Sequence, residues 1–365
     1  MDKLKKLREK IDRIDEQILQ LLNKRAEVVL EIARVKTDQN LRFHNPERER
    51  QIIDRLISLN RGPFPNDALK VIFREILSAS LSLEEPLKVA CLGPLATFTH
   101  LAAVRHFGSS AEIIPVKTIK DVFDIVHQRK ANYGVVPIEN SNEGVISYTL
   151  DMFVDSDLKV SGEIMLEINH NLLSKADDLK KIKRIYSHPQ ALAQCRNFIE
   201  RNLPGVTLID APSTAKAAEM ASEDPESAAI ASELAAKIYD LNILERNIED
   251  NRNNYTRFLI IGDTFPGPSG KDKTSIMLSI KDRPGALYDV LAPFKKLKIN
   301  LTKIESRPSR RKAWEYIFFI DMEGHIQDKK LTKAFEEVEK HCLFLKVLGS
   351  YPRADEITKL EKYYD

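Results

Sequence analysis

A hydroxyl and a cation stand side by side at the start of an apolar run in the second half of the chain. Thr256 and Arg257 of the stretch NYTRF directly precede the apolar residues LIIG, and the segment before them is almost entirely polar. A guanidinium can bind a carboxylate through two parallel hydrogen bonds, and a hydroxyl can donate one to a nearby oxygen. The pair therefore predicts a binding or catalytic role at the mouth of a buried strand.

Two further cations lie in the first segment of the chain, where apolar residues recur with the three-and-four spacing of an amphipathic helix. Arg25 interrupts this spacing at a position where a core residue is expected. Lys36 follows three helical turns plus about 20° later, so both cations lie on one face about 16 Å apart. An isolated arginine could simply set the register and extend to solvent, but two cations on one face could bind one small anion.

The length and composition indicate a folded protein of several domains. The chain has 365 residues, 30% charged and 43% hydrophobic, with a formal net charge of +2, and a single hydrophobic core seldom organises so many residues. The chain lacks a long basic block, a signal peptide and any apolar run of membrane-spanning length. We therefore expect a cytoplasmic protein that binds neither nucleic acid nor membrane.

The three cysteines predict no special chemistry. Cys91, Cys195 and Cys342 lie far apart and without CxxC spacing, so neither a disulfide framework nor a zinc site is indicated. We expect buried, inert thiols, and no metal ion or cofactor.

The pattern along the chain predicts a multidomain protein with three different folds. Residues 1–86 show helical spacing with a break at 60–67, which predicts an all-α domain. Residues 87–265 alternate strand-like and helical runs, typical of an α/β domain with a parallel or mixed sheet. Residues 273–351 follow the order strand, helix, strand, strand, helix, strand of an α+β ferredoxin-like domain. Residues 352–365 form a tail without an obvious partner.

The first helix is too long for a small monomeric domain. From residue 4 to residue 36 it would extend roughly 50 Å, so an intertwined dimer is expected. Arg8 lies about 25 Å before Arg25 along this helix and cannot serve the same site within one chain. It could serve the site of the partner subunit.

The first segment resembles the all-helical chorismate mutase family. The resemblance rests on LREKIDRIDEQILQLLNKRAEVVLEIARVK, NPERERQI and FREILSASLSLEEP. It implies that Arg8 of the partner subunit and Arg25 bind the two carboxylates of chorismate, while Lys36 faces the ether oxygen of the breaking bond. Such a rearrangement needs no nucleophile or metal, only a fixed geometry and donors aimed at the developing charge. The remaining positions that match the family's site are Arg48, Glu49, which is expected to hold the substrate hydroxyl, Ser80 and Glu84.

Five polar or turn-forming stretches in the middle segment, each beside a predicted strand, resemble prephenate dehydratase when taken together. They are GPLATFTH, PIENSNEG, SHPQALAQC, PSTAKAA and NNYTRF. Each alone is more often a turn or a helix cap, but strand ends of open α/β sheets meet at binding sites. The resemblance implies two α/β lobes like those of periplasmic binding proteins, with the site between them. Ala96 stands where the family usually has glycine.

The resemblance also implies roles for the middle segment. Prephenate loses carbon dioxide and hydroxide as its ring becomes aromatic. Arg257 is expected to bind a carboxylate and Thr256 to assist the departing hydroxyl, although an aliphatic hydroxyl is too weak an acid to supply the proton alone. Glu139 is a candidate proton source. The candidate substrate-binding residues are Thr97, Asn140, Ser141, Ser213 and Phe258.

The last segment resembles an ACT domain, the amino-acid-binding module of dehydratases in this pathway. The resemblance rests on DRPGALYDVLAPF and INLTKIESRP. It implies that phenylalanine binds at a subunit interface, although a charged pair in this segment could also be only a hairpin salt bridge. The candidate allosteric residues are Gly285, Ala286, Leu287, Glu305, Ser306, Arg307 and Pro308.

The whole chain therefore resembles the bifunctional chorismate mutase/prephenate dehydratase family. That resemblance implies conversion of chorismate to prephenate and then to phenylpyruvate, inhibition by L-phenylalanine, and a homodimer or tetramer. Two alternatives stay open. The dehydratase could prefer arogenate, or the chain could be a non-catalytic amino-acid-binding regulator, which would not need Arg25 in a helix seam.

Overall fold

The computed structural model describes residues 2–39, 41, 43–309 and 316–354 of the chain. The chain divides into two compact units, residues 1–87 with 107–112, and residues 88–106 with 113–365.

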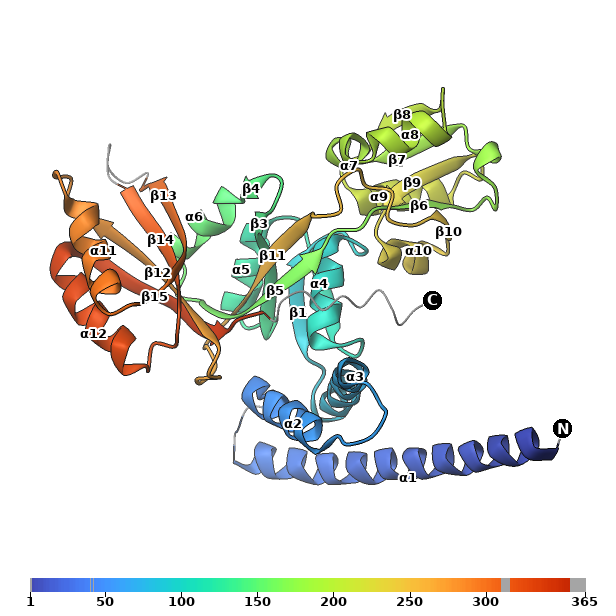
Figure 1. The fold of residues 1–365 in the computed structure, drawn as a ribbon, viewed down its shortest axis with the longest axis horizontal. Helices are drawn as coiled ribbons and strands as arrows, with labels where there is room; N and C mark the ends of the chain where they lie inside the picture. Colours follow the sequence, from blue (N-terminus) through green and yellow to red (C-terminus); the bar gives the residue numbers. More distant parts are fainter. Residues whose placement is uncertain (1, 40, 42, 310–315, 355–365) are drawn as a thin grey trace. The chain divides into compact units, whose positions relative to one another are not determined.

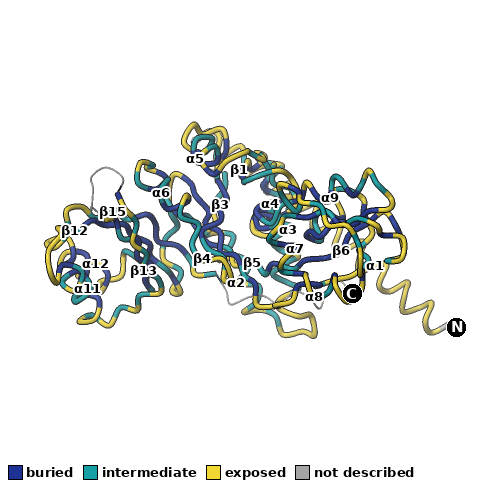
Figure 2. The backbone as a smooth tube through the Cα atoms, turned by 90° about the horizontal axis from the view of Figure 1, so that it is seen from above, coloured by how far each residue is buried: buried dark blue, intermediate teal, exposed yellow. Residues whose placement is uncertain are grey.

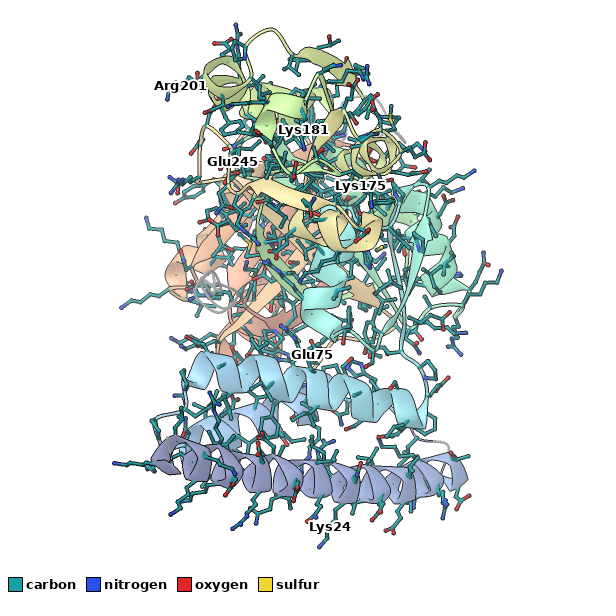
Figure 3. The ribbon with its side chains drawn as sticks, turned by 90° about the vertical axis from the view of Figure 1, so that its right-hand side faces the viewer. Lys24, Glu75, Lys175, Lys181, Arg201 and Glu245 are labelled. Atoms are coloured by element: carbon teal, nitrogen blue, oxygen red, sulfur yellow. The ribbon has the colours of Figure 1, made fainter. Side chains whose placement is uncertain are left out.

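The described residues of the first unit form three helices, which confirms the predicted all-α fold (Figure 1). They are α1 (Asp2–Asp38), α2 (Pro46–Leu59) and α3 (Asn66–Glu84). Asn45 caps α2 by accepting a hydrogen bond from the backbone N–H of Arg48, and the break predicted at 60–67 separates α2 from α3. The side chain of Lys24 points away from α3 (Figure 3). The N-terminal part of α1 is exposed along its length (Figure 2).

A mixed sheet forms the first lobe of the second unit. Its order is β2-β1-β3-β11-β5, with β4 paired to β3; β1 runs parallel to β3, and β11 runs antiparallel to both β3 and β5. The strands are β1 (Lys88–Leu92), β2 (Glu112–Val116), β3 (Tyr133–Asn140), β4 (Gly144–Val145), β5 (Lys159–Glu167) and β11 (Tyr255–Gly262). The helices are α4 (Phe98–Phe107), α5 (Ile119–His127) and α6 (Ser147–Asp155).

A second mixed sheet, of order β10-β6-β9-β7-β8, forms the second lobe and confirms the expected two-lobed α/β arrangement. The chain passes between the two sheets at residues 168–170 and again at 246–254. The strands are β6 (Asn171–Ser174), β7 (Arg184–Ser187), β8 (Thr207–Asp210), β9 (Ser227–Ala231) and β10 (Asn242–Glu245). The helices are α7 (Pro189–Gln194), α8 (Arg196–Asn202), α9 (Thr214–Ser222), α10 (Glu233–Tyr239) and the 3₁₀ turn η1 (Leu179–Lys181).

The C-terminal part has the strand and helix order expected of a ferredoxin-like domain. Its antiparallel sheet has the order β13-β14-β12-β15, and α11 and α12 cover one face around Val290, Phe294 and Phe335. The elements are β12 (Asp272–Ile280), α11 (Ala286–Lys296), β13 (Leu301–Pro308), β14 (Tyr316–Glu323), α12 (Lys329–Val338), η2 (Glu339–His341) and β15 (Cys342–Pro352). Most of the predicted tail, residues 355–365, lies outside the described residues.

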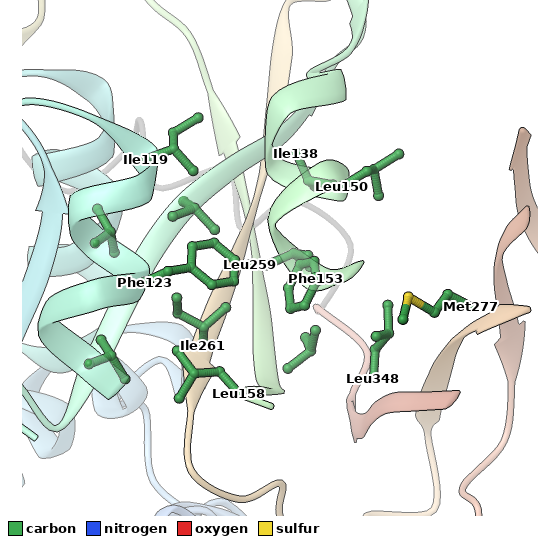
Figure 4. Packing of buried hydrophobic residues seen from close by; sticks show 14 of the residues in the cluster. Ile119, Phe123, Ile138, Leu150, Phe153, Leu158, Leu259, Ile261, Met277 and Leu348 are labelled. Carbon is green, nitrogen blue, oxygen red and sulfur yellow. The ribbon is translucent and has the colours of Figure 1, made fainter. Parts of the chain in front are cut away.

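The other face of this C-terminal sheet packs directly on the first lobe. Phe153 and Leu259 of the lobe share one buried apolar cluster with Met277 and Leu348 of the C-terminal domain (Figure 4). The lobe and the C-terminal domain therefore have a common core, and a displacement of one is resisted by close packing against the other.

The cysteines show no sign of reactivity. Cys91 and Cys195 are buried, and Cys342 is half-buried. Burial raises the pKa of the Cys91 thiol to about 12 and that of Cys342 to about 11. The expectation of buried thiols is confirmed for Cys91 and Cys195.

No helix in the described part of the chain is both long and apolar enough to span a membrane. No group of three or more His, Cys, Asp or Glu side chains is placed to hold a metal ion among those residues.

Candidate active sites

The first candidate site joins α1 to α3 in the helical unit. Arg25 donates a hydrogen bond from Nη1 to Oγ of Ser80. Nζ of Lys36 lies 2.9 Å from Oε2 of Glu84 and donates a second bond of 2.8 Å to the carbonyl oxygen of Phe43. The helical spacing that put both cations on one face of α1 thus directs them to one face of α3.

Carboxylates balance the cations of this cluster. Burial lowers the pKa of Arg25, although the carboxylates of Glu84 and Glu49 act in the opposite direction. Five of the seven residues expected here therefore come together. Arg48 is exposed on α2, and Arg8 is exposed near the start of α1, about 25 Å before Arg25 along the helix.

In the second unit, Thr256 and Arg257 face opposite sides of the same strand. In the antiparallel pairing of β11 with β3, Thr256 lies opposite Asn140 and Arg257 lies opposite Glu139. Side chains alternate between the two faces of a strand. One face therefore carries Thr256 with Asn140, and the other carries Arg257 with Glu139.

The hydroxyl of Thr256 is held by an amide whose orientation is fixed. Asn140 donates from Nδ2 to Oγ1 of Thr256 over 2.8 Å. Its Oδ1 accepts from the backbone N–H groups of Asn142 and Glu143 at 2.9 and 3.0 Å, so the amide cannot be turned round. Because Thr256 is the acceptor of this bond, its own hydroxyl hydrogen is left to donate elsewhere.

A chain of hydrogen bonds continues from Asn140 to the segments that connect the lobes. Asn140 also donates to Oδ1 of Asn254 over 2.8 Å, and Asn254 donates to Oε1 of Gln194 over 3.2 Å. Nε2 of His170 lies 2.9 Å from the same Gln194 oxygen. Burial lowers the pKa of His170, against the opposing effect of the Gln194 bond, so neutral imidazole is favoured.

These three additional residues were not predicted as site residues. Gln194 and Asn254 lie within the motifs HPQALAQC and NNYTRF, so the motifs contained a signal for them. His170 lies in the first connecting segment, next to β6, and the sequence offers no comparable signal there.

Arg257 is bound by the protein's own carboxylates. Its Nε lies 2.7 Å from Oε2 of Glu163, its Nη1 lies 2.6 Å from Oδ2 of Asp321, and its Nη2 donates to the Tyr351 hydroxyl over 3.1 Å. Burial opposes the charge, but Tyr351, Asp321 and Glu163 outweigh it and raise the pKa of Arg257 well above its ordinary value.

The space beside Arg257 is small. The cavity that Arg257 lines together with Lys303 and Asp321 has a volume of about 20 Å³, which is room for about one water molecule. This arrangement does not support the expected role of Arg257 as a contact for a substrate carboxylate.

Glu139 lies on the same face as Arg257. Its Oε2 is 2.8 Å from Nζ of Lys303 in the C-terminal domain and 4.0 Å from Nη1 of Arg257. The sheet separates this carboxylate from the hydroxyl of Thr256. The structure therefore does not support proton transfer between Glu139 and Thr256.

The other candidate substrate-binding side chains hold the local backbone in place. Thr97 donates to the carbonyl oxygen of Leu92 and accepts from the backbone N–H of His100. Ser213 caps α9, and Ser141 accepts from the backbone N–H of Tyr255. Phe258 is 1% exposed. The structure brings Asn140 and Ser141 next to the strand end that carries Thr256; it shows no contact of Thr97 or Ser213 with that hydroxyl among the described residues.

The turn before α4 has an unusual backbone at Ala96. Its φ is 69°, in the left-handed region that favours glycine, and its N–H donates to Nδ1 of His100 over 2.9 Å. A glycine at this position, as the resembled family usually has, would adopt the same backbone without strain.

The candidate allosteric residues lie on α11 and β13. Gly285, with φ 80°, precedes α11, which begins at Ala286 and Leu287. Burial alternates along β13: Glu305 and Arg307 are half-buried, and Nε of Arg307 lies 3.5 Å from Oδ1 of Asp151 in the first lobe. Ser306 and Pro308 are exposed on the other face. The four β13 residues are thus divided between the two faces of the strand.

Comparison with known proteins agrees with the order of the domains. Three family models match the chain: chorismate mutase type II at residues 7–85, prephenate dehydratase at residues 89–265, and the ACT domain at residues 274–340. The bifunctional chorismate mutase/prephenate dehydratase of Aquifex aeolicus is 54% identical over 97% of this chain and 99% of its own length.

Solved structures that cover about three quarters of this chain include two with the same TM-score. The prephenate dehydratase of Arthrobacter aurescens, in complex with L-Phe, has a TM-score of 0.68 and 34% identity, covering 74% of this chain and 91% of that one. GqqA, described as a novel type of quorum-quenching acylase, has a TM-score of 0.68 and 30% identity, covering 73% of this chain and 98% of that one.

The fold, the two clusters of side chains and these similarities define a multidomain enzyme with an isomerase domain and a lyase domain. The chain belongs to the bifunctional chorismate mutase/prephenate dehydratase family. Its C-terminal part is an ACT domain. The alternative of a non-catalytic regulatory protein is therefore set aside.

Proposed function

We propose that the chain converts chorismate to prephenate in its helical unit and prephenate to phenylpyruvate in its two-lobed domain, with L-phenylalanine as the inhibitor. The second step is supported by the hydroxyl of Thr256. Its oxygen accepts a hydrogen bond from Asn140, so its hydrogen is free to be donated to the substrate. The first step rests on the cluster of Arg25, Lys36 and Glu84 between α1 and α3.

In the mutase site the helices position donors for a pericyclic step. Arg25 and Arg8 of the partner subunit would hold the two carboxylates of chorismate. Lys36 would turn from Glu84 to the ether oxygen, where negative charge grows as the carbon–oxygen bond breaks. Glu49 would hold the substrate hydroxyl, and no covalent intermediate forms.

In the dehydratase site the electron pair of the departing carboxylate completes the aromatic ring and expels the ring hydroxyl. Thr256 donates a hydrogen bond to that hydroxyl and so stabilises the charge that develops on it. Because an aliphatic hydroxyl does not give up its proton outright, water must finally supply the proton. Asn140 acts as a positioning residue that fixes the direction of the donation.

The regulatory site belongs to the ACT domain. Its support is the family match and the similarity to a prephenate dehydratase whose structure contains L-Phe. We place the ligand near the start of α11 at Gly285 and the exposed edge of β13, at an interface between two subunits. A homodimer that pairs through α1 and the ACT domain, located in the cytoplasm, completes the proposal.

The similarity to an acylase does not lead to a second proposal. An acyl-transfer site needs a nucleophile with a base in hydrogen-bond reach. In the described part of the chain Thr256 is bound by the amide of Asn140, and His170 is separated from it by Gln194, Asn254 and Asn140.

A pair of substitutions tests both activities. Thr256→Ala should abolish dehydratase turnover and leave mutase turnover intact, whereas Lys36→Ala should do the reverse. The full chain is incubated with chorismate, prephenate or arogenate, and the products are separated by chromatography and identified by retention, absorbance and mass, because chorismate and prephenate are isomers of equal mass. If the wild-type chain forms phenylalanine from arogenate faster than phenylpyruvate from prephenate, arogenate replaces prephenate as the proposed substrate. Loss of both activities in either variant would contradict the division between the two sites.

A further inference from the structure

Arg257 is the centre of a buried ion cluster that spans the dehydratase and ACT domains. One partner, Glu163, lies on β5 of the first lobe, beside β11. The other two, Asp321 and Tyr351, lie on β14 and β15 of the ACT sheet. We call the group Arg257, Glu163, Asp321 and Tyr351 the interdomain cluster.

Further contacts tie the interdomain cluster to the ACT sheet. Lys273 of β12 lies 2.9 and 2.8 Å from the two oxygens of Glu163. Ser275 of β12 donates to Oδ1 of Asp321 over 2.5 Å and lies 2.6 Å from the Tyr351 hydroxyl. Side chains from three ACT strands, β12, β14 and β15, therefore bind Arg257 or one of its partners.

The burial of this cluster makes its geometry demanding. Arg257 is 8% exposed, Glu163 is 6% and Asp321 is 8%. Breaking a buried ion pair is strongly destabilising, so a shift of the ACT sheet would draw the guanidinium toward Asp321 and Tyr351. If the guanidinium stayed behind, it would keep Glu163 of its own lobe but leave the buried carboxylate of Asp321 without this cation.

Arg257 is covalently adjacent to the residue proposed for catalysis. A displacement of the Arg257 backbone toward or away from the ACT sheet would change the position of Thr256 on the opposite face of β11. The hydrogen bond of 2.8 Å from Asn140 to Thr256 would then lengthen or turn, because Asn140 is held by β3 and the loop after it. The direction of the Thr256 donation would change with it.

We propose that Arg257 is a positioning residue that binds the ACT domain rather than the substrate, and that the interdomain cluster couples the state of the ACT domain to the hydroxyl of Thr256. The inference rests on the proposed feedback inhibition by L-phenylalanine. It adds the physical connection between the regulatory domain and the reacting group.

The test uses Asp321→Asn in the full chain, which removes one charge partner of Arg257 with little change in shape. L-phenylalanine should still bind, as followed by calorimetry. The concentration that half-inhibits the dehydratase should rise on the order of tenfold, within the range typical of allosteric coupling. Mutase turnover should not change.

Glu323→Gln is the matched control. It neutralises a carboxylate two residues along β14 whose ion pair with Arg353 is exposed at 43% and 42%. This variant should keep the inhibition of the wild type. If Asp321→Asn also loses L-phenylalanine binding, Tyr351→Phe, which removes only a hydroxyl, replaces it as the test and should weaken the inhibition in the same direction.

Arg257→Lys separates the two roles of the arginine. If Arg257 is a positioning residue, Arg257→Lys should lower kcat and weaken inhibition, while KM for prephenate stays within about twofold of the wild-type value. A rise in KM alone would instead indicate the loss of a ground-state contact with the substrate. In a double variant with Asp321→Asn the effects on inhibition should be non-additive, because both changes break one ion pair.

The outcomes distinguish this inference from the proposed function. A wild-type chain that L-phenylalanine does not inhibit would overturn the feedback function itself. A wild-type chain that is inhibited, with Asp321→Asn and Tyr351→Phe inhibited equally, would overturn the coupling alone. So would a large rise in KM for Arg257→Lys with normal inhibition.

Discussion

In the proposed dehydratase site, the role of Thr256 depends on the direction of a single hydrogen bond. Asn140 can only donate to Thr256, because two backbone N–H groups occupy its Oδ1. The free hydroxyl hydrogen of Thr256 is a consequence of that geometry, and no part of it requires a charged group near the reacting oxygen. In our proposal, a polar but uncharged residue therefore directs the hydroxyl of its neighbour toward the substrate.

Asn140→Asp should reverse this direction. A carboxylate would accept a hydrogen bond from Thr256, which would turn the hydroxyl hydrogen away from the substrate. Because loss of one positioned donor typically lowers turnover by about 10²- to 10³-fold, we expect a fall in dehydratase kcat of that order, a smaller change in KM and normal mutase turnover. Steady-state kinetics on prephenate measures both constants.

Asn142→Asp controls for the added charge. Asn142 is exposed two residues away, and it contacts Asn140 only through its backbone N–H. Its substitution should leave turnover near that of the wild type. Normal kcat in Asn140→Asp, or an equal loss in Asn142→Asp, would contradict the role of the hydrogen-bond direction.

The sequence predicted which face of an element a residue lies on where the helical repeat alone decides this. Helical spacing alone put Arg25 and Lys36 on one face, and the structure brings both to α3. The same reasoning applied to NYTRF would have separated Thr256 from Arg257, since neighbours on a strand point to opposite faces. Which face meets the ACT domain could not be predicted, because it depends on Asp321 and Tyr351, which are far away in the sequence.

Among the secondary-structure elements, strands rich in branched residues were predictable and others were not. The runs KVACL, EIIPV and RIYS are strands in the structure. The buried strand β9, with the sequence SAAIA, consists mainly of alanine and lacks that signal. Its position is set by pairing with β6 and β7, which is a property of the folded sheet.

The strand β15 approaches β5 so closely that one position admits only glycine. A Cβ atom on Gly349 would lie 2.1 Å from the carbonyl oxygen of Val160, and neither backbone can yield without disturbing its sheet. Gly349→Ala should destabilise the packing of the ACT domain on the first lobe by about 1–3 kcal/mol or more, as overpacking does. L-phenylalanine inhibition should weaken as well.

Thermal unfolding and limited proteolysis between residues 263 and 271 would measure this loosening. Gly62→Ala is the control, because the nearest atom to its added Cβ is 3.9 Å away. An unchanged melting temperature and proteolysis rate in Gly349→Ala would show that the two strands are not held at this distance.

At the scale of the whole molecule, we expect α1 to be covered by a second copy of the chain. Large apolar side chains along α1 are exposed, including Leu21 at 66% and Leu4 at 58%. Contiguous apolar surface of this kind marks an interface, and the heptad spacing of these residues fits a second copy of α1. The length of the helix and the spacing of its apolar residues were predictable from the sequence, and the second copy of α1 that covers them is our prediction.

Subunit complementation tests the proposed dimer together with its shared site. Arg8→Ala and Arg25→Ala chains should each lack mutase activity alone. If Arg8 acts in the partner's site, a mixed dimer contains one intact site, and random mixing should restore about a quarter of the wild-type activity.

The pair Arg25→Ala and Lys36→Ala is the control, because both cations contact α3 of their own chain, at Ser80 and Glu84, and so belong to one proposed site. Every site in that mixture lacks one cation, so no activity should return. Both mixtures are prepared by co-expression so that chains pair as they fold. Recovery in the control would contradict the placement of Arg25 and Lys36 in the site of one chain. No recovery in the Arg8 mixture, when mixed dimers are shown to be present by mass, would contradict a site that takes Arg8 from one subunit and Arg25 from the other.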